Sequence, residues 1–196
     1  GASAIWHRNY WDVIVQNKQA LANIRNYIRY NPQNYDVVMN CGEPCLLGNA
    51  ALLDMPQTGF LASRGAPELH NLLRLKQGEV IISGFLSPME RAVFKAGLEH
   101  QRPLIWVKPW GLGHDRGVVY QDSSTPQVRM AIEAGRLLIV SPFDDNIEAP
   151  SVRRAVWCNQ YVLAKCERMM VGYLNPGGML ACILSEANPD KEIIYL

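Results

Sequence analysis

Short apolar runs recur along most of the chain, separated by stretches long enough for a turn and a helix. Runs with few polar positions are typical of strands that are buried on both faces of a parallel sheet. The pattern predicts strands at 59–62, 80–83, 104–107, 137–140, 169–174 and 192–195. Strands and helices that alternate in this way fold into a doubly wound α/β sheet. We therefore expect a mostly parallel, Rossmann-like sheet.

One helix between these runs has a clear start signal. Ser87 can cap the helix, Pro88 has the backbone angle of a first turn, and Glu90 completes a capping box. Apolar spacing then predicts a buried stripe made of Met89, Ala92, Val93 and Ala96.

A second helix is predicted to begin at Ser151, just after Pro150. Its inward-facing residues are expected to be Ala155, Val162 and Cys166. Arg153 and Arg154 fall in its first turn, where the positive end of the helix dipole disfavours a cation unless an anion is close. This placement indicates a negatively charged ligand.

The chain changes character between Asn31 and Asp54. Residues 5–31 are rich in Asn, Tyr and Trp, and a helix is predicted over 16–30, ended by Asn31-Pro32. We divide the chain into a small helical N-terminal extension, 1–54, and a Rossmann-like domain, 55–196.

Composition narrows the classes of function. The 196 residues carry a formal net charge of +1, too little for a strong field toward nucleic acid or membrane, so any nucleic-acid binding must use a local site. The five cysteines are odd in number and lack zinc spacing, and the four histidines are scattered. We expect reduced thiols, no metal, no cofactor, no membrane partner and a cytoplasmic location, since no secretory signal is visible.

Candidate ligand-binding residues follow the predicted strands, because doubly wound sheets bind ligands at the carboxyl ends of their strands. Small residues at such turns let backbone amides approach an anion, and an arginine can grip a phosphate. The candidates for holding phosphate or nucleic acid are Ser63, Arg64, Gly65, Ser83, Gly84, Pro176, Gly177 and Gly178. Neither G-x-G-x-x-G after a strand nor a P-loop motif is present.

Several short motifs occur together in a recognisable order: Gly59-Phe60-Leu61-Ala62-Ser63-Arg64, Ile81-Ile82-Ser83-Gly84-Phe85, Gly135 to Pro142, Trp157 to Ala164, and Asn175-Pro176-Gly177-Gly178. Over residues 57–185 the chain resembles the DNA-processing protein A family. The resemblance implies a Rossmann-like domain that binds single-stranded DNA in recombination. It also implies a binding role for Asn159, although Cys158 and Gln160 stand where that family has arginines.

The N-terminal segment carries a different resemblance, through residues 6–15 and 24–32. It is similar to the end of a single-tyrosine transposase of the kind associated with repeated extragenic palindromes. Tyr27 or Tyr30 would correspond to the nucleophile, but no His-hydrophobic-His element precedes it, and a tyrosine near its ordinary pKa of about 10 is a poor nucleophile. We interpret the segment as a transposase remnant or docking helix, with Tyr27 packing rather than reacting.

Three hypotheses about function follow. The first is a non-catalytic protein that binds a nucleotide or single-stranded nucleic acid. The second is a nucleoside monophosphate phosphoribohydrolase, since Pro176-Gly177-Gly178 is similar to part of that family's motif; Leu184 stands at the place of its catalytic glutamate, and Glu186 comes two residues late. The third is an interaction scaffold that forms a homodimer through the N-terminal helix.

Overall fold

The computed structural model describes residues 44–66, 78–112, 126–185 and 187–196. Contacts divide the chain into two units, 1–39 and 40–196, and the fold described below belongs to the second. The division falls inside the stretch where the sequence changes character. The helix expected at 16–30, and Tyr27 within it, lie outside the described residues.

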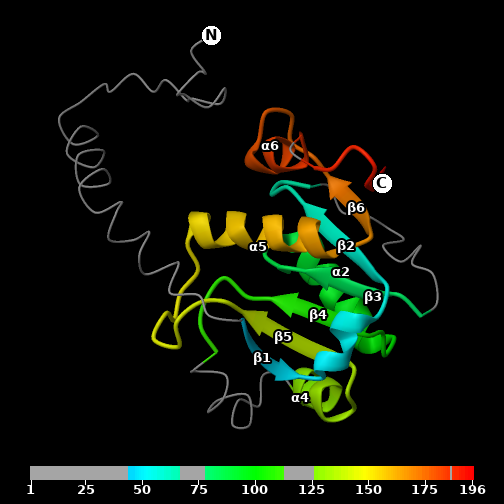
Figure 1. The fold of residues 1–196 in the computed structure, drawn as a ribbon, viewed down its shortest axis with the longest axis vertical. Helices are drawn as coiled ribbons and strands as arrows, with labels where there is room; N and C mark the ends of the chain where they lie inside the picture. The colour runs from blue at the N-terminus through cyan, green and yellow to red at the C-terminus, as the bar shows by residue number, and fades with distance from the viewer. Residues whose placement is uncertain (1–43, 67–77, 113–125, 186) are drawn as a thin grey trace, which may run out of the picture. The chain divides into compact units, whose positions relative to one another are not determined.

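A seven-stranded sheet with the order β1-β5-β4-β3-β2-β6-β7 forms the centre of this unit (Figure 1). Its strands are β1 (Cys45–Gly48), β2 (Gln57–Ala62), β3 (Val80–Ser83), β4 (Leu104–Val107), β5 (Leu137–Ser141), β6 (Arg168–Tyr173) and β7 (Glu192–Tyr195). All neighbours are parallel except β1 and β5. The predicted doubly wound, mostly parallel α/β fold is confirmed.

The six predicted strands all belong to the sheet, and β1 is a seventh that the sequence analysis did not find. β1 is an antiparallel edge strand whose residues are alternately half-buried and exposed. It is followed by a 3₁₀ helix, η1 (Ala50–Asp54), that leads into β2. Both elements precede residue 55, so the sheet unit begins earlier in the chain than the Rossmann-like domain expected from the sequence.

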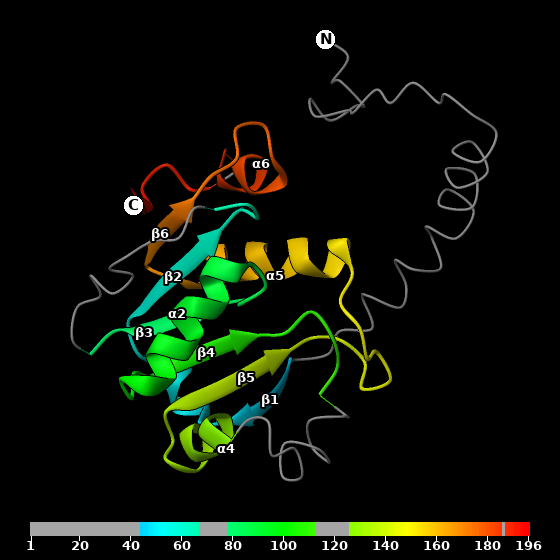
Figure 2. The same cartoon turned by 180° about the vertical axis from the view of Figure 1, so that it is seen from behind.

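Helices cover both faces of the sheet. α5 (Val152–Lys165) crosses one face, with α6 (Met179–Ser185) beside it (Figure 1). α2 (Pro88–Glu99) and α4 (Pro126–Glu133) lie on the opposite face (Figure 2). Strands β2 to β5 follow one another in one direction across the sheet, and β6 then returns to the other side of β2. The order of the strands therefore reverses between β2 and β6.

The core lies on both sides of the central strands, whose residues are almost completely buried. Between the sheet and helices α2 and α4 the cluster includes Phe60, Ile81, Val93, Leu104 and Ile139. Because side chains alternate along a strand, the neighbouring Leu61 and Ile82 fall on the face toward α5.

Both predicted helix starts are confirmed. Ser87 Oγ accepts a hydrogen bond from the Glu90 amide at 3.2 Å, and the Glu90 carboxylate accepts one from the Ser87 amide at 3.4 Å. Ser151 caps α5 in the same way, with its Oγ accepting from the Arg154 amide at 3.3 Å.

The buried stripe predicted for α2 is wrong in part. Ala92 is exposed and Ala96 is only half-buried, whereas the buried residues are Met89, Glu90, Val93 and Gly97. A Cβ at Gly97 would lie 2.8 Å from the side chain of Leu104, so the helix meets β4 closely along the line through Gly97. Ala92, five residues before Gly97, falls about 140° around the helix from this contact and is exposed.

The cap of α2 gives a first prediction. Replacing Ser87 by alanine removes the acceptor for the Glu90 amide, and we expect the free energy of unfolding to fall by about 1 kcal/mol. The matched control is Ser185→Ala, because the Ser185 hydroxyl is exposed and bonds only the Cys182 carbonyl near the end of α6. Urea denaturation measures both variants. Equal stability of the two variants would contradict the prediction.

Candidate functional site

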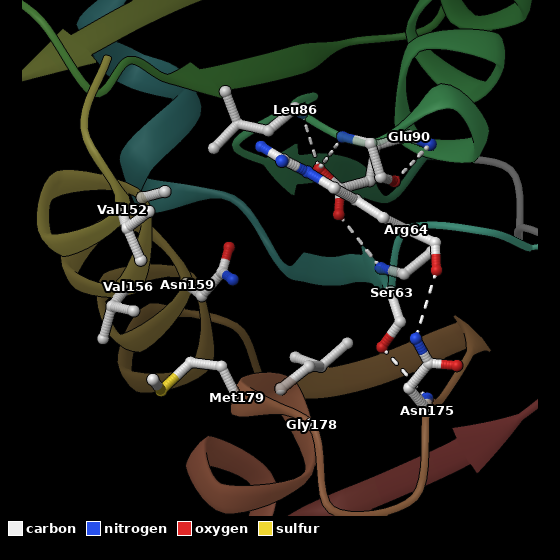
Figure 3. Close-up of a pocket in the computed structure, with 14 residues that line it drawn as sticks. Ser63, Arg64, Leu86, Glu90, Val152, Val156, Asn159, Asn175, Gly178 and Met179 are labelled. Carbon is white, nitrogen blue, oxygen red and sulfur yellow. Dashed lines mark hydrogen bonds between the residues drawn. The ribbon is translucent and has the colours of Figure 1, made fainter. Parts of the chain in front are cut away.

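A pocket of about 270 Å³ opens at the carboxyl ends of β2 and β6, where the strand order reverses (Figure 3). Open α/β sheets bind ligands at such a switch point, because the connections leave the sheet toward opposite faces there and separate. Its walls come from the end of β2, the turn after β3, and helices α2, α5 and α6. The pocket is therefore the candidate functional site.

Two of the turns predicted to bind a ligand, those after β2 and β6, meet at this pocket and form hydrogen bonds with each other. The Ser63 amide donates to the Tyr173 carbonyl at 2.8 Å, and Ser63 Oγ accepts from the Asn175 amide at 3.1 Å. The side chain of Asn175 donates to the Arg64 carbonyl at 3.2 Å. The turn after β2 and the turn after β6 thus form one continuous rim, although about 110 residues separate them.

A β-bulge in β6 sets the register of this rim. Leu61 pairs with Val171 but Ala62 pairs with Tyr173, so Gly172 is the extra residue. Glycine at position 172 allows close packing, because a Cβ there would lie 2.4 Å from the sulfur of Met89 and 2.7 Å from the Phe60 ring, and these side chains would have to shift. Bulges are frequent next to functional sites, where they redirect the chain.

Glu90 joins the ends of β2 and β3 beneath the pocket. It is only 3% exposed, and its carboxylate accepts the amides of Ala62 at 3.0 Å, Leu86 at 2.7 Å and Ser87 at 3.4 Å. Desolvation by burial raises the pKa of this carboxyl group, while the three amides act against that rise. The sequence analysis found only its capping role, since a contact with Ala62, 28 residues away, leaves no sign in local sequence.

The turn after β3 is strained at Phe85, and its later residues, Leu86 and Ser87, line the pocket. Phe85 has a φ of 51°, a left-handed conformation that costs a residue other than glycine on the order of 1–3 kcal/mol. Buried Ser83 holds the turn by accepting the Phe85 amide at 3.1 Å, and the Gly84 carbonyl accepts from Trp106 Nε1 at 3.2 Å. The Ser83 hydroxyl therefore bonds within the turn and the Gly84 carbonyl bonds to β4, and neither residue lines the pocket.

The structure brings four predicted site residues to the pocket: Ser63, Arg64, Asn159 and Gly178. Three others lie in the same turns outside the lining: Gly65, Pro176 and Gly177. Positive φ angles of 82° and 70° explain glycine at positions 65 and 177. Among the lining residues that the sequence analysis did not name as site candidates, Asn175 and Glu90 are recognised by their hydrogen bonds to distant turns.

Arg64 is the exposed cation of the pocket. Its side chain extends along the pocket rather than away from it (Figure 3). Within the described part of the chain, its guanidinium makes no hydrogen bond or ion pair. Its five donors are therefore available to a ligand.

Arg154, at the start of α5, is different. Its guanidinium donates to the carbonyls of Pro109 at 2.9 Å and Ala149 at 2.6 Å. These acceptors explain a cation in the first turn of α5 without any bound anion.

Much of the remaining wall is apolar. Leu86, Val152, Val156, Met179 and Leu180 line the pocket, and two of them are unusually exposed for large apolar residues, Val152 at 72% and Met179 at 51%. An exposed apolar surface beside a pocket is typical of a binding site for a flat or apolar group.

Asn159 adds a polar group to this wall. It is half-buried on α5, and its side-chain amide has no hydrogen-bond partner among the residues that the structure describes. A free side-chain amide offers a donor and an acceptor together, as the edge of a nucleobase requires. Its neighbour Cys158 is fully buried, and burial raises the pKa of that thiol, so Cys158 is an uncharged core residue.

Three further expectations from the sequence concern hydrolysis, metal binding and membrane spanning. Leu180 and Leu184 are buried in α6, and Glu186 lies outside the described residues. Across the described ranges, no group of three or more His, Cys, Asp and Glu side chains comes together in a way that could hold a metal ion. In the same residues, no helix is both long enough and apolar enough to cross a membrane.

No family model matches the chain, and no curated protein matches it. The resemblance of the N-terminal segment to a transposase therefore receives no support from these comparisons. Solved structures do match. DNA processing protein A from Streptococcus pneumoniae aligns with a TM-score of 0.54 and 15% identity over 92% of this chain and 71% of that one.

DNA processing protein A from Helicobacter pylori also aligns with a TM-score of 0.54 and 15% identity, over 82% of this chain and 75% of that one. Its structure was described for the way in which that protein binds single-stranded DNA. At this identity the likeness shows the fold, which is that of DNA processing protein A.

The buried carboxylate gives a second prediction. Because burial raises the pKa of Glu90 above its ordinary value of 4.5, the folded protein binds this proton more tightly than the unfolded chain does. The resulting stabilisation is complete below pH 4.5 and is lost as the pH rises through the folded-state pKa. The free energy of unfolding of the wild type minus that of Glu90→Gln should therefore decrease from pH 4.5 toward neutral pH.

Chemical denaturation at a series of pH values measures this difference. Glu99→Gln, at the exposed end of the same helix, is the control for the loss of a surface carboxylate. A difference in the free energy of unfolding between the wild type and Glu90→Gln that increases with pH would contradict the predicted direction.

Proposed function

We propose that this protein is a non-catalytic binding protein for single-stranded nucleic acid or a nucleotide, and that it acts in DNA processing and recombination. The observation that carries this proposal is the pocket at the switch point, which combines an arginine and a side-chain amide that have no partners among the described residues with an apolar wall. These three features correspond to the phosphate, the base edge and the base face of a nucleotide.

Arg64 supports the phosphate part of the proposal. Guanidinium groups bind phosphate oxygens in a bidentate way, and Arg64 has no competing carboxylate within ion-pair distance among the described residues. The overall net charge of +1 supplies little attraction, so this local cation must provide it.

The apolar wall supports the second part of the proposal, which is that the pocket holds a nucleobase. A pocket of about 270 Å³ is smaller than the roughly 300–1,000 Å³ of pockets for drug-sized ligands, and suits a single base or nucleoside. Proteins that bind single strands without strong sequence preference combine a cation with surfaces for the faces of the bases. The single-stranded DNA binding described for the Helicobacter pylori protein of the same fold adds weight to this ligand class.

A binding role without catalysis agrees with the state of Glu90. Its carboxylate lines the pocket but already accepts three backbone amides, so it is engaged as a structural acceptor. Arg64 and Asn159, which have no partners in the part of the chain that the structure describes, are suited to binding rather than to nucleophilic attack.

The proposal predicts a loss of binding in Arg64→Ala. Fluorescence anisotropy with a labelled oligothymidylate should show affinity about tenfold or more below wild type, since a hydrogen-bonded charge pair is worth about 1.5–3 kcal/mol. Arg129→Ala is the matched control, because Arg129 is exposed on α4 and pairs with Glu133 away from the pocket.

Three outcomes would count against this proposal. A wild-type protein that binds neither the oligonucleotide nor nucleoside monophosphates would reject it. Equal losses of affinity in Arg64→Ala and Arg129→Ala would show that the pocket is not the binding site. Release of free base from nucleoside monophosphates would favour the phosphoribohydrolase alternative.

A homodimer through the N-terminal segment and a cytoplasmic location remain proposals. The helical spacing at 16–30 supports the first, and the free thiols of Cys45, Cys158, Cys166 and Cys182 agree with the second. Sedimentation of the chain with and without residues 6–31 tests the dimer. An unchanged oligomeric state after the deletion would remove its support.

A further inference from the structure

We infer that Glu90 fixes the orientation of the bound nucleotide, so that the base enters the pocket and the phosphate remains outside at Arg64. This inference rests on the proposed function and deepens it. It assigns the interior of the pocket to an uncharged base and makes Glu90 a positioning residue.

The amides that could hold a phosphate inside the pocket are already used. Amides at the ends of parallel strands commonly bind the phosphate of a nucleotide in sheets of this kind. In this protein the amides of Ala62, Leu86 and Ser87 all donate to the Glu90 carboxylate. A phosphate at this position would have to displace that carboxylate.

The same carboxylate disfavours any anion in the pocket. Glu90 is 3% exposed and lines the pocket, and it takes part in no ion pair within the described residues. Charges interact strongly where water is excluded, and like charges repel each other. At pH values above the raised pKa of Glu90, the floor of the pocket therefore repels phosphate and accepts an uncharged group.

The walls provide a surface for that group. Leu86 and Leu180 line the pocket together with the side chains of α5, and the exposed Val152 and Met179 extend the apolar surface outward. Asn159 lies on the same wall (Figure 3), and its side-chain amide bonds to none of the described residues. A base can therefore be held by its faces and read along one edge.

The cation is at the rim. Arg64 belongs to the exposed turn after β2, and its backbone carbonyl is held by Asn175. Its guanidinium is exposed, extends along the pocket (Figure 3) and has no partner among the described residues, so it can attract a phosphate. With the base inside, the sugar and phosphate extend outward to this arginine.

The test compares an intact oligothymidylate with an abasic strand of the same length and charge, using the whole wild-type protein. The intact strand should bind about tenfold or more tightly, the scale of affinity that one stacked base supplies. Inorganic phosphate should fail to displace it. Equal affinity for both strands would overturn the inference but leave the proposed function intact, whereas binding of neither strand would overturn the proposed function.

Two variants assign the effect to the pocket. Glu90→Gln removes the charge, so the preference for the intact strand should shrink and inorganic phosphate should begin to compete. A folded Glu90→Gln with an unchanged preference would overturn the role of Glu90.

Ala155→Trp fills the pocket from α5 and leaves Arg64 and Glu90 in place. It should lower the affinity for the intact strand to that for the abasic one. If Glu90→Gln does not fold, this variant still tests whether a base enters the pocket. An unchanged affinity for the intact strand would show that no base enters the pocket.

Discussion

The hydrogen bonds between the Glu90 carboxylate and three backbone amides hold the candidate site in shape. They join the last residue of β2 to the turn after β3, and they come from the first turn of the helix that follows β3. A buried carboxylate is stable only when it is well supplied with donors. One of these hydrogen bonds, from the Leu86 amide, holds the residue that follows the strained Phe85.

The strand order of the sheet places the Glu90 carboxylate at the switch point. The chain builds β2 to β5 in one direction and then returns to β6, which leaves a gap between the connections at the carboxyl end of β2. The turns on either side of this gap are bonded through Ser63 and Asn175, so they form one rim. The same reversal brings α5 and α6 to the pocket and places apolar side chains opposite Arg64. Fold and site therefore have a common origin.

The sequence predicts much of the fold, because buried parallel strands are short apolar runs and capping boxes are local. Ser87 and Ser151 could be recognised as helix starts without any tertiary information. Strand β1 could not be recognised, since half of it is exposed and it is stabilised by pairing with β5. The exposed position of Ala92 depends on the close approach of Gly97 to β4, which spacing along a helix does not contain. In the site, Ser63 and Arg64 followed from a turn motif, whereas the roles of Glu90 and Asn175 depend on contacts between distant turns.

The central claim is that a nucleotide binds at the switch point between β2 and β6. The most direct measurement follows backbone amide resonances by NMR while an oligothymidylate is titrated into the isotopically labelled protein. The account predicts that the largest shifts occur at Ser63, Arg64, Asn175 and Gly178, with α4 unaffected. Shifts that cluster on α4 or β1, or the absence of shifts at the rim while the strand is bound, would contradict it.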